Sequence, residues 1–224
     1  DYSYLSWFSM LFSAGMGIGL LFYSVAEPIS HFAITVPPDA DVEPGSEAAA
    51  IEAMNRTFFH WGLHAWAIYI IVGLALCYFA YRKGLPLTVR SAFYPLIGDR
   101  IRGPIGDAVD TLAIVGTLFG VASSLGLGVI QINAGLTYVA GVETSQIVQL
   151  LLIIGITAVA TLSVLLGLEG GIKRLSVGNM VLGGILVGFL LLVGPTVFIL
   201  RGLVETTGYY LQNIISTSMN THMF

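Results

Sequence analysis

The chain has 224 residues, of which 56% are hydrophobic and only 10% are Asp, Glu, Lys or Arg. Soluble domains carry about 25% charged residues, so this composition excludes an ordinary soluble protein. The net charge of −4 argues against a nucleic-acid-binding protein, and the single cysteine, Cys77, excludes a disulfide framework. The composition therefore predicts an all-α integral membrane protein.

Five apolar segments are long enough to cross a bilayer, because a crossing helix needs about 20 apolar residues. In chain order they are Tyr4–Val25, Phe58–Ala80, Ala108–Val139, Ile147–Leu168 and Leu175–Leu200. We therefore expect a five-span transmembrane unit over residues 1–200. Residues 201–224 are too polar to span and predict an amphipathic helix on the membrane surface. A second amphipathic helix is expected at Ser46–Arg56, directly before the second span.

The charged residues of the loops predict an orientation. Seven of the nine Lys and Arg residues fall in the second and fourth loops, namely Arg82, Lys83, Arg90, Arg100, Arg102, Lys173 and Arg174. Loops rich in Lys and Arg stay in the cytoplasm. We therefore expect a multi-pass protein of the cell membrane with a cytoplasmic N-terminus.

Three glycines alternate within the first span, at Gly15, Gly17 and Gly19. Irregular backbone inside a membrane persists only where protein or a polar cavity satisfies its hydrogen-bonding groups. Transporters use such weakened helices to turn backbone carbonyls toward ions and substrates. The pattern predicts an interrupted first span. The alternative is close helix packing, since Gly15 and Gly19 also fit the GxxxG pattern.

The second span carries three aromatic residues, Trp61, Trp66 and Tyr69. At about 100° per residue in a continuous helix, all three can line one side of a cavity. Aromatic faces attract a quaternary ammonium group, which cannot donate hydrogen bonds. The alternative is that Trp and Tyr near a helix end form the interfacial aromatic belt.

Three long motifs in the same order resemble the betaine/choline/carnitine transporter family, and the glycine-betaine symporters most of all. They are GMGIGLLFYSVAEPISHF (Gly15–Phe32), FFHWGLHAWAIYIIVGLALCYFAYRKG (Phe58–Gly84) and DTLAIVGTLFGVASSLGLGVIQINAGL (Asp110–Leu136). Family members have twelve spans, with a core of two five-span repeats of opposite orientation, as in the LeuT-like fold. The resemblance implies that this chain is the first repeat, spans three to seven, of a longer protein whose second repeat is missing here.

The resemblance also implies a site. The carbonyls of Ser13 and Met16 would contribute to a sodium site, and the glycine run and the three aromatic residues would border the substrate. Thr117, on the third span, would help to hold a second sodium ion. Val121 stands where the family can have a second threonine, which makes that second ion doubtful. The alternative for Thr117 is a hydrogen bond back to its own helix.

The function implied is sodium-coupled import of glycine betaine, or of a similar quaternary-ammonium osmolyte such as choline or carnitine, for osmoprotection. The glycine run is uncharged, which favours a zwitterion over choline. No nucleophile–base pair or metal cluster indicates an enzyme, and sodium is the only ion expected. The full-length protein could form a homo-oligomer. The alternative function is a non-transporting five-span module that acts as an assembly or interaction subunit.

Overall fold

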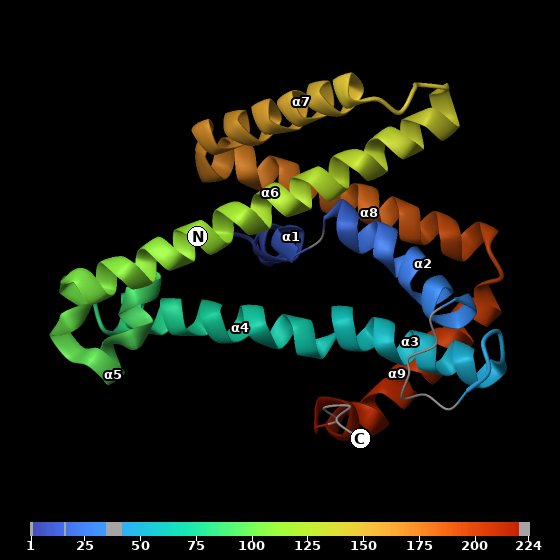
Figure 1. The fold of residues 1–224 in the computed structure, drawn as a ribbon, viewed down its shortest axis with the longest axis horizontal. Helices are drawn as coiled ribbons and strands as arrows, with labels where there is room; N and C mark the ends of the chain where they lie inside the picture. The colour runs from blue at the N-terminus through green and yellow to red at the C-terminus, as the bar shows by residue number, and fades with distance from the viewer. Residues whose placement is uncertain (1, 16, 35–41, 220–224) are drawn as a thin grey trace. The chain divides into compact units, whose positions relative to one another are not determined.

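The computed structural model describes residues 2–15, 17–34 and 42–219, which form helices joined by short connections (Figure 1). The helices are α1 (Tyr4–Gly15), α2 (Ile18–Ala33), α3 (Glu47–Trp61), α4 (Leu63–Cys77), α5 (Tyr94–Ile97), α6 (Pro104–Ala140), α7 (Gln146–Leu165), α8 (Lys173–Val193) and α9 (Thr196–Met219). These described residues contain no strand, which confirms the all-α class.

The chain divides into two compact units. The first unit comprises residues 1–58 and 127–224, and the second comprises residues 59–126. The boundaries fall within α3 and α6.

Four helical segments in the described part of the chain are long and apolar enough to cross a membrane. They are Glu47–Arg82, Pro104–Ala140, Gln146–Leu165 and Leu168–Val193. The first of the five expected spans is not among these segments, because its helix is interrupted. The first apolar segment is divided into α1, with 12 residues, and α2, with 16, and each is shorter than a full crossing.

The division of the first segment confirms the predicted interruption. α1 ends at Gly15 and α2 begins at Ile18, with Gly17 extended between them at φ −112° and ψ −178°. α2 then continues to Ala33, well past the expected end at Val25, and contains Pro28. A proline inside a membrane helix is tolerated because neighbouring groups can satisfy the carbonyl that it leaves unpaired.

The expected end of the fifth span at Leu200 is wrong. α8 ends at Val193, and the helix that follows begins at Thr196, ahead of the expected start at residue 201. Pro195 explains the break, because a proline forces the preceding residue out of the α conformation. Gly194 is accordingly extended, at φ −81° and ψ 179°.

A helix is present where one was expected before the second span, namely α3. Its start is capped by Ser46, whose hydroxyl accepts a hydrogen bond from the Ala49 amide at 3.1 Å. Ala49 and Ala53 are buried. In the same unit, the Phe58 ring of α3 stacks on Tyr210 of α9, with centroids 5.6 Å apart. Tyr210 is the buried residue of α9.

α7 and α8 are joined by a tight turn in the first unit. A π-helical turn, Leu168–Ile172, leads from the end of α7 into α8. A Cβ on Gly171 would lie 1.9 Å from the Ser163 carbonyl oxygen, so this crossing of the two segments needs glycine. Gly167, just before the turn, has a φ of +74°, which also favours glycine.

Most large apolar side chains of the described helices are exposed. The buried apolar residues in this part of the chain are small in number, namely Ala49, Ala53, Ile101, Val129 and Tyr210. A soluble fold could not leave such a surface in water. In a bilayer, the same surface contacts lipid or the helices of a neighbouring segment.

Candidate substrate and ion site

The break in the first apolar segment lies at the C-terminal end of α1. The last four carbonyls of an α-helix have no partner within the helix, and α1 ends at Gly15, so the Ser13 carbonyl belongs to this group. Sodium is a hard cation that binds oxygen, and helix-end carbonyls inside a membrane are suited to it. Met16, the other expected ligand, lies outside the described residues.

The glycine run does not form a packing face of one helix. Gly15 is the last residue of α1 and Gly19 lies in the first turn of α2, so the GxxxG alternative, which needs one continuous helix, does not apply. A Cβ on Gly17 would meet no atom within 4 Å. Space beside the backbone at Gly17 is therefore open to a ligand or to another segment.

The Ser13 side chain joins α1 to α8 within the first unit. Its hydroxyl donates to the Ser176 carbonyl oxygen at 3.2 Å and accepts from the Asn179 side-chain amide at 3.4 Å. Ser176 is buried, and Ser13 and Asn179 are half-buried. No local pattern predicts this contact, because the partners are more than 160 residues apart in the chain.

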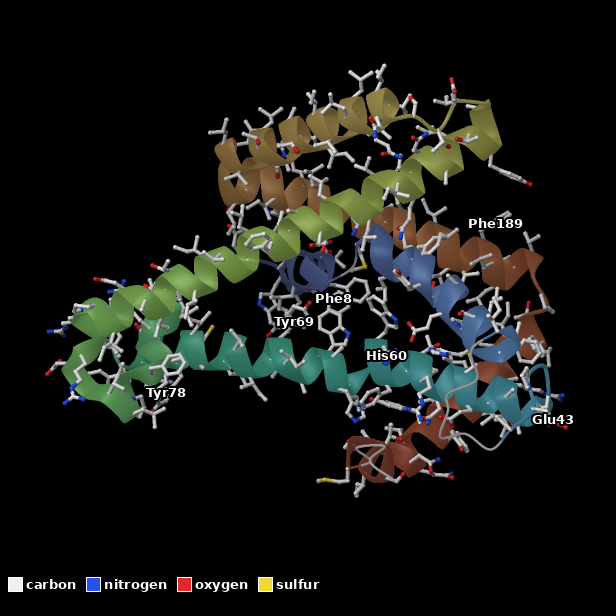
Figure 2. The ribbon with its side chains drawn as sticks, in the orientation of Figure 1. Phe8, Glu43, His60, Tyr69, Tyr78 and Phe189 are labelled. Carbon is white, nitrogen blue, oxygen red and sulfur yellow. The ribbon has the colours of Figure 1, made fainter. Side chains whose placement is uncertain are left out.

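Two of the three expected aromatic residues form a pair on α4, in the second unit. The rings of Trp66 and Tyr69 lie 5.8 Å apart between centroids, at 48° to each other. Trp66 is half-buried, whereas Tyr69 is 66% exposed; Figure 2 shows Tyr69 on α4. Such a pair offers ring faces that a quaternary ammonium group can contact.

Trp61 does not share a continuous helix with that pair, so the expected angular arrangement of the three residues is wrong. Trp61 is the last residue of α3, and Gly62 interrupts the helix at φ −92° and ψ −143° before α4 begins at Leu63. The calculation at 100° per residue holds for Trp66 and Tyr69 only. The glycine between Trp61 and Leu63 was the available signal for this break.

Thr117 and Val121 line an open groove along α6, within the second unit. The groove has a volume of about 540 Å³ and is bordered also by Thr88, Asp110 and Ala113. The Thr117 hydroxyl donates to the Ala113 carbonyl at 2.8 Å, which is the back-bonded state of the alternative interpretation. Donation uses only the proton, so the hydroxyl oxygen keeps both of its lone pairs.

Sequence reasoning missed an ionic cluster at the start of α6, in the second unit. The Arg90 guanidinium contacts the carboxylates of Asp110 and Asp107, the latter at 2.9 Å, and donates to the Ile101 carbonyl at 3.2 Å. The Arg90 backbone amide also donates to Asp110, at 2.9 Å. Hydrogen bonding to Asp110, and then to Asp107, raises the pKa of Arg90 against the opposing effect of burial. The cluster fixes the loop before α6 to the helix itself.

The glycine break and the aromatic pair belong to different units of the chain. Each offers one part of what a carrier needs, since helix-end carbonyls can bind a cation and ring faces can bind a quaternary ammonium group. Taken with the four long apolar helices, these features define a multi-pass helical membrane protein.

The chain belongs to the betaine/carnitine/choline family of transporters, whose family model matches residues 1–224. It is 51% identical over 224 residues to a glycine betaine transporter of Acinetobacter baylyi. It is 52% identical over 218 residues to a glycine betaine transporter of Bacillus subtilis, and 45% identical over 233 residues to a glycine betaine/proline/choline transporter of Vibrio parahaemolyticus. These relatives are transporters and not enzymes.

The matches cover nearly all of this chain but only part of each relative. They include 100%, 97% and 98% of this chain, and 33%, 42% and 42% of the Acinetobacter, Bacillus and Vibrio proteins. The chain therefore spans well under half the length of these relatives.

Proposed function

We propose that this chain is the first-repeat part of a membrane transporter that imports glycine betaine or a related quaternary-ammonium compound with sodium. The observation that carries the proposal is the helix break at Gly15–Ile18, in a chain of this transporter family. Glycine betaine carries its own carboxylate, so an uncharged glycine run suits it better than it suits choline. The relatives named for glycine betaine support the same substrate class.

In this proposal the first unit supplies an ion site, and the second unit supplies a site for the quaternary ammonium group. The helix-end carbonyl of Ser13, with that of Met16, binds sodium. Trp66 and Tyr69 hold the quaternary ammonium group by cation–π contact. A second repeat, on the part of the protein outside this chain, completes these sites, and the N-terminus of this chain faces the cytoplasm.

The proposal is tested by uptake into liposomes that contain the purified full-length transporter. Labelled glycine betaine is added with an inward gradient of sodium, and then with potassium in its place at equal ionic strength. We expect accumulation against the betaine gradient with sodium only. Choline, carnitine and proline are added as competitors to rank the substrates. Uptake driven equally well by a proton gradient without sodium would refute sodium as the coupling ion. Absence of betaine uptake under all gradients would refute the proposed transport of betaine.

The second candidate function is a non-transporting five-span module that acts as an assembly or interaction subunit. It is considered because this chain covers less than half of the length of its relatives. Liposomes with this chain alone are compared with liposomes in which the chain is fused to a second repeat. We expect concentrative uptake from the fusion and none from the chain alone, because a site between inverted repeats needs both. Uptake by the chain alone would show that the second repeat is not needed for transport.

A further inference from the structure

The contact between α1 and α8 carries an inference about how the helix break is held in place. Ser13 lies two residues before the end of α1, so its position sets where the free carbonyls of that end point. Its hydroxyl is bound from α8 through the Ser176 carbonyl and the Asn179 amide. The contact therefore lies next to the proposed sodium ligands without being one of them.

A serine in a membrane helix does not need a second helix to satisfy its hydroxyl, because it can donate to a carbonyl one turn back. Ser9, one turn earlier on α1, does this, with its hydroxyl 2.8 Å from the Leu5 carbonyl oxygen. Ser9 is fully buried, so burial alone does not force a hydroxyl to bond across helices. Ser13 instead donates its proton to α8.

The α8 side of the contact is also suited to hold a position. The Ser176 carbonyl lies near the start of α8 and has two lone pairs, so it can accept from Ser13 as well as within its own helix. The Asn179 amide donates to the same Ser13 oxygen. Donor and acceptor on α8 thus fix both the place of the Ser13 hydroxyl and the direction of its proton.

We propose that Ser13 is a positioning residue, whose hydrogen bonds to Ser176 and Asn179 hold the end of α1 against α8. These bonds thereby also hold the carbonyl oxygens at the helix break in place. This inference rests on the proposed sodium-coupled transport. Loss of the contact lets the end of α1 move, so its carbonyls bind the ion less well. The quaternary-ammonium end of the substrate, proposed to lie on α4, is affected less.

The test uses the full-length transporter in liposomes and four variants, Ser13→Ala, Ser13→Thr, Asn179→Ala and Ser9→Ala. Initial betaine uptake is measured against sodium concentration, and separately against betaine at saturating sodium. We expect Ser13→Ala and Asn179→Ala to raise the sodium concentration for half-maximal uptake by about three- to tenfold, as for one interhelical hydrogen bond in a membrane. The KM for betaine should change much less.

The matched control is Ser9→Ala, which removes a buried hydroxyl from the same helix but leaves the contact with α8 intact. We expect it to resemble the unmodified protein, and Ser13→Thr, which keeps a hydroxyl, to recover most of the sodium affinity. The inference is overturned if Ser13→Ala and Asn179→Ala behave like Ser9→Ala, or if they change the sodium and betaine dependences equally.

A measurement that needs no transport separates this inference from the proposed function. The thermal unfolding midpoint in detergent is compared for Ser13→Ala, Asn179→Ala and the double variant. If the two side chains contact each other, the double variant should lose less than the sum of the single losses. Additive losses would refute the contact. A protein that shows the coupling but no sodium-dependent uptake would instead refute the proposed function and leave the contact standing.

Discussion

Gly106, in the first turn of α6, should not tolerate a side chain. A Cβ there would lie 1.9 Å from the Ile101 carbonyl oxygen and 2.6 Å from its carbon, both of which are backbone atoms. Ordinary contacts between heavy atoms lie near about 3.5 Å, so Gly106→Ala must separate the two backbone segments by about 1.5 Å. That movement displaces the oxygen that accepts from Arg90 and partly exposes Ile101, which is now buried.

The expected cost of Gly106→Ala is that of overpacking, about 1–3 kcal/mol. The loss of stability is measured as a fall in the thermal midpoint of the detergent-solubilised full-length protein. The midpoint is the temperature at which half of the protein no longer elutes as a single species in size-exclusion chromatography. A fall of about 2–10 °C is expected. Gly116→Ala on the same helix is the control, because a Cβ there meets no atom within 4 Å and alanine favours helix. Equal midpoints for the two variants would refute the reasoning.

Three further predictions concern the proposed function. Trp66→Leu and Tyr69→Leu should each weaken betaine binding by about five- to thirtyfold, the worth of a cation–π contact of about 1–2 kcal/mol, without reducing membrane insertion; unchanged affinity in both would favour the interfacial belt. Val121→Thr should steepen the sodium dependence of uptake, because it restores a second hydroxyl one turn from Thr117 in the groove along α6; an unchanged slope would count against a second ion there. Cysteines introduced at the exposed Glu43 and Asp99, with the native Cys77 replaced by serine, should be labelled from opposite sides of the membrane; labelling of both from one side, in comparable amounts, would show dual topology.

The local features of the fold could be predicted from the sequence. The length of the apolar segments predicted a membrane protein, and the three alternating glycines predicted the break between α1 and α2. The break at Gly62 and the end of α8 before Pro195 were missed although each had a local signal. In both places a glycine or a Gly-Pro pair lies within a long apolar segment, and it interrupts the helix although the segment stays apolar.

Contacts between distant residues could not be predicted in this way. Arg90 pairs with Asp110 across two short helical elements, Tyr94–Ile97 and Gly98–Arg102. Ser13 pairs with Asn179 after six intervening α-helices, α2 to α7. Neither pair has a sequence spacing that a helix or strand period would bring together. Asp110, in the early part of α6, is the ion-pair partner of Arg90.

The short connection between α7 and α8 has a consequence for the insertion of this part of the chain into the bilayer during synthesis. No Asp, Glu, Lys or Arg occurs within α7 or between Leu175 and Val193. The backbone at Gly171 lies close to the Ser163 carbonyl, so the connection between α7 and α8 is short. Under the proposed orientation, Lys173 and Arg174 stay at the side of synthesis when these helices insert, and Glu143, between α6 and α7, is the charge that crosses the membrane.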